Sequence, residues 1–310
     1  MFARTWGFDS LQPHEWAPDG GRYEVGAPAR ESHCGGSCRG GLRPSLRVER
    51  ALQRDGHRVL AGMDEVGRGA LAGPVTVGVV IIDESCRTAP QGVKDSKLLA
   101  PHARERMVPR IERWALAHAV GHASADEIDE IGIIAALRLA GCRALTATGI
   151  RPDLVILDGN HDWLTSPEDV GLLAFAHEDR VDTPPVTTMI KADLKCSSVA
   201  AASVLAKVIR DRIMVDLGAQ EAYSGYGWVE NKGYAAPEHL DALRRLGPCE
   251  LHRRSWRLPG TMDDDDGMSV RMPPEALEAS PPDALGPVGA DDLYLTDLTG
   301  TTDLTRVGER

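Results

Sequence analysis

The sequence has few aromatic residues and lacks a long apolar run. Aromatic residues make up only 5% of the 310 residues, so the core must be mostly aliphatic. The longest largely apolar run, Val75–Ile82, is far shorter than the roughly 20 residues of a membrane-spanning helix. The chain also does not open with a basic segment followed by an apolar one, so we do not expect a secretory signal. These features argue against membrane and secreted proteins and favour a cytoplasmic location.

Cysteine is also scarce. The chain has six cysteines, and four of them stand singly within segments that resemble helices or strands. In a chain of this length without a secretory signal, reduced thiols are the better interpretation. Cys34 and Cys38 have a spacing that could bind a metal ion, but one pair without a second pair is weak evidence for zinc.

The chain lacks the net positive charge that is typical of nucleic-acid-binding proteins. Its formal charge is −11, but the acidic residues are concentrated near the C-terminus. Residues 261–310 hold twelve Asp/Glu and three Lys/Arg, which leaves a charge of −2 on the preceding 260 residues. Residues 191–257 have an excess of basic residues, eleven against eight acidic. The net charge of the whole chain therefore does not exclude a nucleic-acid partner.

Composition divides the chain into three parts. Residues 1–45 are rich in Gly, Pro and Arg without a sustained period, so we expect a disordered or loosely ordered extension. Residues 46–259 carry the apolar periodicity of a folded domain. Residues 260–310 are rich in Pro and Asp, which predicts an acidic disordered tail.

The periodicity of the folded part predicts a mixed α/β sheet, because clustered strands are followed by alternating helices and strands. Ser45 is a candidate cap for a short first helix, and Ser197 or Ser198 for the last long one. A capping-box pattern begins at Ser124. The predicted strands are 59–63, 75–82, 153–158 and 186–190, and the predicted long helices are 101–118, 124–147 and 197–217.

Four acidic residues stand where predicted strands end or a helix begins: Asp64, Glu65, Asp158 and Asp193. Carboxylates that converge repel each other and are stable together only with cations between them. Oxygen-rich sites suit Mg²⁺ or Mn²⁺, and two such ions can hydrolyse a phosphodiester. Any one of these acids taken alone is more simply a cap or a surface ion pair.

The first two acids are neighbours in a predicted strand, and neighbours point to opposite faces. Asp64 and Glu65 can therefore share one site only if the strand ends or bulges there. The glycine loop that follows, made of Gly67, Arg68 and Gly69, allows such a bend. Its backbone N–H groups can approach a polyanion or a sugar, and Arg68 is available for a phosphate.

Two further motifs have simple structural interpretations beside functional ones. Asp95-Ser96-Lys97 is typical of a turn or a helix cap. The cation group His252-Arg253-Arg254 is by default a solvated surface, and alternatively a phosphate clamp.

Taken together and in order, these motifs resemble the signature of the ribonuclease HII family, most closely its actinobacterial branch. They span about Ala61 to Trp256, and Ala192 departs from the glycine found at that position in much of the family. The matching segments are AGMDEVGRGALAGPV at 61–75, DSK at 95–97, LDGN at 157–160, KAD at 191–193, AAASVLAKVIRD at 200–211, NKGY at 231–234, His239 and HRRSW at 252–256.

The resemblance implies an RNase H-like fold, with a mixed five-stranded sheet flanked by helices and a small C-terminal helical part. It implies a monomeric endonuclease that depends on Mn²⁺ or Mg²⁺ and cleaves the RNA strand of RNA–DNA hybrids. It also implies cleavage 5′ to single ribonucleotides in duplex DNA, which leaves 3′-hydroxyl and 5′-phosphate ends and serves ribonucleotide removal in replication and repair.

The resemblance also implies roles for individual residues. Asp64, Glu65 and Asp158 look like metal ligands, and Asp193 looks like the fourth catalytic acid. The glycine loop looks like the reader of the ribose 2′-hydroxyl. The remaining residues expected to bind substrate are Tyr234 near the RNA–DNA junction, Lys207 and Arg253.

Two other function classes remain open at this point. Another RNase H-like nuclease, such as a resolvase or transposase, also gathers acids at strand ends but does not need a 2′-hydroxyl reader. A non-catalytic hybrid-binding module is expected to have lost at least one of the four acids, and all four are present.

Overall fold

The computed structural model describes residues 43–166 and 183–259. The predicted acidic tail, the Cys34–Cys38 pair and nearly all of the predicted N-terminal extension lie outside the described residues. Ser45 falls within that predicted extension, but its N–H donates to the carbonyl of Lys195 at 3.0 Å. Ser45, at the predicted boundary, is therefore bonded to the folded body.

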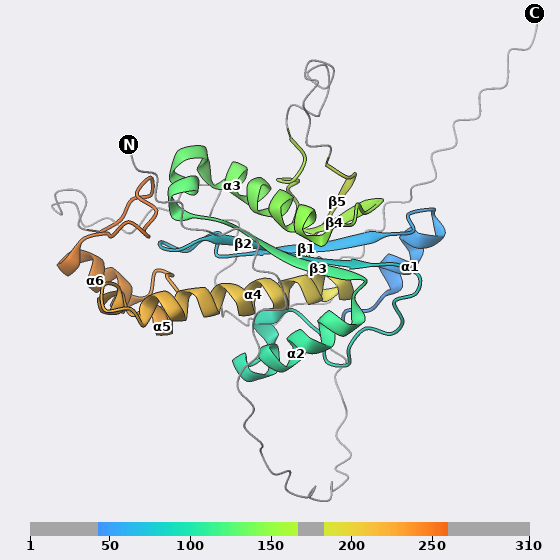
Figure 1. The fold of residues 1–310 in the computed structure, drawn as a ribbon, viewed down its shortest axis with the longest axis horizontal. Helices are drawn as coiled ribbons and strands as arrows, with labels where there is room; N and C mark the ends of the chain where they lie inside the picture. Colours follow the sequence, from blue (N-terminus) through green and yellow to red (C-terminus); the bar gives the residue numbers. More distant parts are fainter. Residues whose placement is uncertain (1–42, 167–182, 260–310) are drawn as a thin grey trace, which may run out of the picture. The chain divides into compact units, whose positions relative to one another are not determined.

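The centre of the fold is a five-stranded mixed sheet with the strand order β3-β2-β1-β4-β5 (Figure 1). The first three strands are antiparallel, whereas β4 and β5 run parallel to β1. This confirms the mixed five-stranded sheet that the resemblance implies. The strands are β1 Leu60–Val66, β2 Val75–Ile82, β3 Ala117–Ala123, β4 Leu154–Asp158 and β5 Val186–Met189.

Helices cover both faces of the sheet: α3 lies on one face, and α4 and α2 lie on the other (Figure 1). The helix bounds are α1 Arg47–Arg54, α2 Pro101–Trp114, α3 Ala125–Thr148, α4 Ser197–Gly218, α5 Trp228–Asn231 and α6 Pro237–Leu246. The short helices α5 and α6 form the small C-terminal helical part expected above.

The long helix α3 begins at the predicted capping box. The N–H of Glu127 donates to Ser124 Oγ, and the N–H of Ser124 donates to the Glu127 carboxylate. Among the described residues α3 is the one helix long and apolar enough to cross a membrane. It buries residues such as Leu137 and Ala140 in the main core. Because core helices can be equally long and apolar, these properties are weak evidence for a membrane span.

The long helix α4 approaches the sheet closely at two glycines. A Cβ on Gly62 of β1 would lie 2.5 Å from the backbone of Ser198 and Val199 in α4. One on Gly78 of β2 would lie 2.3 Å from the carbonyl oxygen of Ala202. Because these neighbours are backbone atoms, they cannot move aside without shifting the whole helix. The glycines thus set how near the N-terminal half of α4 lies to the ends of the strands.

Gly62→Ala is therefore expected to destabilise the fold by about 2–3 kcal/mol, because it overpacks a rigid contact. Urea unfolding measures this directly. Gly225→Ala is the matched control, since its added methyl meets only the end of the Leu246 side chain and is expected to cost less than about 1 kcal/mol. Equal unfolding midpoints for the two variants would contradict this packing argument.

Three sequence predictions are wrong in detail. The helix predicted over 101–118 ends at Trp114, and the edge strand β3 begins at Ala117. Ser45 is not the N-cap of α1, which is Leu46, although its hydroxyl accepts from the N–H of Arg47 at 3.5 Å. Neither Ser197 nor Ser198 is the N-cap of α4, where Cys196 takes that position.

The N-terminus of α4 is bonded instead by a carboxylate from another helix. Glu49 of α1 is fully buried, and its Oε1 accepts from the N–H and the hydroxyl of Ser198, both at 2.9 Å. A carboxylate at this end of a helix satisfies free N–H groups and is favoured by the helix dipole. The first helix is thus tied to the helix that lies under the candidate site.

Candidate active site

Two of the predicted acids lie on the same face of the sheet at the ends of parallel strands. The parallel pairing of β1 with β4 reaches Met63 and Leu157, so Asp64 and Asp158 are the next residues of the two strands. Gly62 faces α4, and Asp64, two residues on, shares that face because side chains alternate. The register therefore places both carboxylates on the α4 side of the sheet.

Asp193 is brought to this place by the turn after β5. The 3-10 helix η4, Ala192–Leu194, follows that strand, and the N–H of Ala192 donates to Asp158 Oδ1 at 2.7 Å. Lys191 takes the left-handed conformation, with φ of +56°, whereas Ala192 is not among the residues with positive φ. The methyl group of Ala192, which departs from the family pattern, therefore meets no backbone conformation that requires glycine.

The electrostatics of the acids show that they act on one another. Burial, together with the charges of Glu65 and Asp158, raises the pKa of Asp64 well above its usual range. Burial and the negative charges of Asp158 and Asp95 raise the pKa of Asp193 to about 7. Burial likewise raises the pKa of Asp158. A group of carboxylates with raised pKa values is one that would gain from a nearby cation.

Glu65 is placed differently from the other acids. β1 continues without a bulge to Val66, which pairs with Thr76, so the bend considered in the sequence analysis does not occur between Asp64 and Glu65. Alternation then directs Glu65 away from the face of Asp64. Its carboxylate lies 3.7 Å from the guanidinium of Arg68, although the charge of Asp158 still raises its pKa.

The donor set has the chemistry of a site for a hard divalent cation, since it offers only carboxylate oxygens. In the part of the chain that the structure describes, however, no three His, Cys, Asp or Glu side chains are grouped so that they could hold a metal ion. By strand alternation Asp64 and Asp158 share a face and Glu65 does not, although the charge of Glu65 still raises the pKa of Asp64. The roles of Asp64, Glu65 and Asp158 as metal ligands therefore stay predictions.

The sequence predicts a turn or a helix cap at Asp95-Ser96-Lys97. The structure confirms this prediction and shows a further role for Lys97. Asp95 caps the 3-10 helix η1, Ser96–Leu98, by accepting from the N–H of Lys97 at 2.9 Å. The positive charge of Lys97 also lowers the pKa values of Glu65, Asp158 and Asp193. This exposed lysine thus belongs to the acidic site.

Ser203 of α4 is a second residue that sequence reasoning missed. Its hydroxyl bonds that of Ser96 at 2.9 Å, and a hydrogen bond from Ser203 lowers the pKa of Asp64. Because it lies inside α4, only the three-dimensional packing brings it beside the acids. Its place in the family-like segment 200–211 was the only signal in the sequence.

The glycine loop follows β1 directly and is contacted by two buried arginines, Arg210 and Arg253. Gly67 has φ of +84°, and a Cβ there would lie 2.1 Å from Nε of Arg210. Arg253 donates to the carbonyl oxygens of Gly67 at 2.6 Å and Arg68 at 2.7 Å. A glycine is thus required at position 67 for the path of the chain and for close packing, before any substrate is considered.

The prediction that Arg253 binds substrate phosphate is wrong as a direct contact. The side chain is completely buried, and besides the loop carbonyls it donates to the carbonyl of Gly73 at 3.2 Å. Its guanidinium also lies 4.8 Å from the ring centroid of Trp256. Burial and the charge of Arg210 lower its pKa to about 9. Arg253 therefore holds the loop and does not face solvent.

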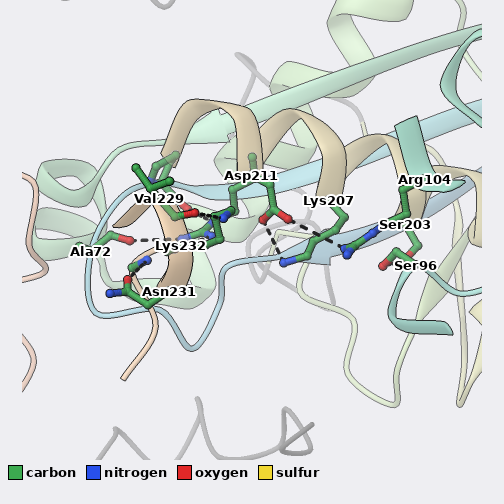
Figure 2. A network of polar contacts seen from close by, with 12 residues as sticks. Ala72, Ser96, Arg104, Ser203, Lys207, Asp211, Val229, Asn231 and Lys232 are labelled. Carbon is green, nitrogen blue, oxygen red and sulfur yellow. Dashed lines mark hydrogen bonds and ion pairs between the residues drawn. The ribbon is translucent and has the colours of Figure 1, made fainter. Parts of the chain in front are cut away.

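Tyr234 and Lys207 lie together beside the loop. The ammonium of Lys207 is 5.6 Å and the guanidinium carbon of Arg210 is 5.2 Å from the Tyr234 ring centroid. Figure 2 shows that Lys207 and Arg104 both reach the carboxylate of Asp211, at 2.9 and 3.9 Å. Contact of Tyr234 or Lys207 with substrate stays a prediction.

Arg210 joins the turn that carries Tyr234 to the glycine loop. It donates to the carbonyl oxygens of Ala72 and Pro74 after the loop and of Lys232 before Tyr234, and Figure 2 shows the Ala72 carbonyl at this junction. The N–H of Leu71 donates to the Gly233 carbonyl at 2.8 Å. The two segments therefore form one connected unit.

The raised pKa values predict how stability depends on pH and on metal. Without metal, the folded protein holds protons that the unfolded chain releases, so stability falls as pH rises from about 4 to about 7, the pKa of Asp193. We expect Mn²⁺ to raise the melting temperature more at pH 7.5 than at pH 5.

Thermal unfolding in EDTA and in MnCl₂ measures both effects. In Asp158→Asn, one of the repelling charges is gone, so the fall in stability with pH and the gain from Mn²⁺ should both be smaller than in the wild type. The same gain from Mn²⁺ in the two proteins would contradict a metal site at these acids.

The comparisons with known proteins agree on one family. A family model described as ribonuclease HII matches residues 61–258. Ribonuclease HII of Streptomyces avermitilis is 47% identical over 214 residues, which cover 69% of this chain and 83% of that protein. The Paracoccus denitrificans protein is 44% identical over 216 residues, which cover 69% of this chain and 91% of that protein.

Among solved structures, the ribonuclease H2 from Pyrococcus horikoshii is similar with a TM-score of 0.49 and 29% identity, covering 64% of this chain and 93% of that one. Two further Streptomyces relatives, both 46% identical, fit the actinobacterial resemblance. The matched segment contains all four acids, the glycine loop and Tyr234. This chain belongs to the ribonuclease HII family and is a ribonuclease H enzyme.

Proposed function

We propose that this enzyme uses Mn²⁺ or Mg²⁺ to cleave the RNA strand of RNA–DNA hybrids and to cut 5′ to single ribonucleotides in duplex DNA. The products are 3′-hydroxyl and 5′-phosphate ends. The proposed role is removal of ribonucleotides from DNA during replication and repair, by a monomer in the cytoplasm. Family membership supports the hybrid substrate.

The observation that carries the proposal is the shared face of Asp64 and Asp158, with the Asp193 turn bonded to it. These three residues would hold the metal ions. Glu65 would join them if its carboxylate leaves Arg68, with which it pairs in the structure. Bound there, divalent ions supply an activated water and stabilise the charge that develops on the phosphate. Lys97 adds a positive charge at the same place.

The glycine loop supports the choice of ribose over deoxyribose. It begins three residues after Asp64, at the end of β1. Arg253 bonds its carbonyl oxygens, and Arg210 packs against Gly67. A rigid loop that bonds a 2′-hydroxyl leaves polar groups unpaired when the sugar is deoxyribose. Such a loss costs about 1–3 kcal/mol, and the misplaced sugar also loses alignment for the reaction.

The test uses four labelled duplexes: all DNA, DNA with one ribonucleotide, a continuous RNA–DNA hybrid, and an all-DNA junction. Each is incubated with Mg²⁺, Mn²⁺ or EDTA, and the cut position is mapped at nucleotide resolution. We expect cleavage of the hybrid and 5′ to the lone ribonucleotide with either metal, and no cleavage in EDTA. Asp64→Asn should be inactive, whereas Asp241→Asn, an exposed ion-pair residue on α6, should act as the wild type does.

Two outcomes would contradict the proposal. Cleavage of the all-DNA junction without cleavage at the ribonucleotide would favour a resolvase-like nuclease. Hybrid binding without cleavage under any metal condition would favour a non-catalytic binding module.

A further inference from the structure

A chain of buried side chains connects the C-terminal helical part to the backbone of Tyr234. His239 of α6 and His252 are both fully buried. Nδ1 of His239 lies 2.8 Å from the carbonyl oxygen of Tyr234. Its Nε2 lies 3.0 Å from Nε2 of His252 and 3.1 Å from the indole Nε1 of Trp228.

The hydrogen-bond partners determine where each proton is. The backbone N–H of Cys249 donates to Nδ1 of His252 at 3.0 Å, so the proton of a neutral His252 is on Nε2 and points at His239. An indole N–H only donates, so Nε2 of His239 is the acceptor for Trp228 as well. The proton of His239 is therefore on Nδ1, where it donates to the Tyr234 carbonyl, which only accepts.

The surroundings keep both rings neutral. Burial lowers the pKa of His239. Burial and the neighbouring His239 lower the pKa of His252 to about 3. At neutral pH the direction of the hydrogen bonds is thus fixed along the whole chain from Cys249 to Tyr234.

This series of hydrogen-bonded side chains anchors Tyr234, which lies in a turn. A second donor to the Tyr234 carbonyl, the N–H of Ala236 at 2.8 Å, belongs to the same turn and cannot hold it against the core. His239 can, because its ring packs near Trp228 and His252 in the core. The Tyr234 ring, in turn, lies beside Arg210, which packs against Gly67 and donates to the carbonyl of Ala72 just after the glycine loop.

We propose that His239 is a positioning residue that fixes Tyr234 relative to the glycine loop, and thereby sets the preference for a lone ribonucleotide over a continuous hybrid. The inference rests on the proposed function and on the place near the RNA–DNA junction that the family resemblance implies for Tyr234. A lone ribonucleotide presents a single RNA–DNA junction, so its cleavage depends on how Tyr234 is placed. A continuous hybrid offers many registers that present a ribose to the loop.

The experiment compares three substitutions of His239 by the ratio of kcat/KM on the two substrates. The amide nitrogen of Asn can take the place of imidazole Nδ1, so His239→Asn should keep the bond to Tyr234. The amide of Gln takes the place of Nε2, and Leu has no donor. We expect the ratio to stay within about threefold of the wild type in His239→Asn, and to fall about tenfold or more in His239→Gln and His239→Leu.

Leu243→Val is the matched control, since Leu243 is a fully buried residue of the same helix that is expected to lower stability without touching Tyr234. Melting temperatures are measured for all variants, and rates are taken where each is folded. The inference is supported if the ratio is unchanged in Leu243→Val and is higher in His239→Asn than in His239→Gln and His239→Leu. Equal losses of kcat/KM on both substrates in His239→Gln and His239→Leu, or a changed ratio in Leu243→Val, would overturn it. A wild type that cuts neither substrate would instead overturn the proposed function, and this inference with it.

Discussion

Asp158→Asn is expected to lower kcat by a factor on the order of 10³ or more, while the affinity for an RNA–DNA hybrid changes little. Removing a group that acts only as charge develops in the transition state has effects of this size. The Asn side chain has nearly the same shape, and its carbonyl oxygen can still accept from the N–H of Ala192, as Asp158 does at 2.7 Å. The turn that carries Asp193 should therefore stay in place.

Binding should be spared because affinity for nucleic acids comes mainly from phosphate contacts. Single-turnover kinetics and fluorescence anisotropy separate the two effects. Asp241→Asn removes an exposed carboxylate from α6 and serves as the control for charge alone. If Asp158→Asn retained more than about a tenth of the wild-type rate, Asp158 could not be a metal-binding catalytic acid.

Arg253→Met is expected to cost at least about 3 kcal/mol of stability, because it removes charged hydrogen bonds to three backbone carbonyls that are buried or partly buried. These carbonyls belong to Gly67, Arg68 and Gly73. The glycine loop should then lose its fixed backbone, and cleavage should fall with it. Urea unfolding and cleavage rates measure the two losses.

The salt dependence of hybrid binding distinguishes this role from the phosphate clamp that the sequence suggested. A lost phosphate contact lowers the slope of log affinity against log salt by about one. Arg253→Met should leave that slope unchanged in the folded protein. Arg254→Met is the control, since Arg254 is exposed and should leave stability nearly unchanged. A reduced slope in Arg253→Met would restore the phosphate clamp.

Local patterns predicted much of the fold. The β-branched run at Val75–Ile82 became β2, and the capping box at Ser124 begins α3. The strand ending in Asp158 was also confirmed. In each case the signal lies within a few residues and matches the environment that the segment meets in the fold.

Non-local contacts explain what the sequence could not show. β3 is an edge strand with a weak pattern, AHAVGHA, and the preceding Leu116 continued the helical spacing of α2. The carboxylate bonded to the N-terminus of α4 comes from Glu49, 149 residues from Ser198. The burial of Arg253 depends on loop carbonyls about 180 residues away in sequence. No window of local sequence contains such partners.

The candidate site was predictable as a set of residues but not as a geometry. The register places Asp64 and Asp158 on one face, and the turn that carries Asp193 is bonded to Asp158, while the roles of these acids stay predictions. Whether Glu65 joins them depended on a bulge, and the register shows an unbroken β1 there. Lys97 and Ser203 enter the site from η1 and α4, which pack beside the strand ends.

The central claim is that the acids at the ends of β1 and β4 hold the catalytic metal. Anomalous diffraction from crystals soaked in Mn²⁺ tests it most directly. The claim predicts an anomalous peak about 2.0–2.2 Å from carboxylate oxygens of both Asp64 and Asp158, absent in Asp158→Asn crystals. Mn²⁺ bound elsewhere, or no peak at these carboxylates when the soaked enzyme is active, would contradict it.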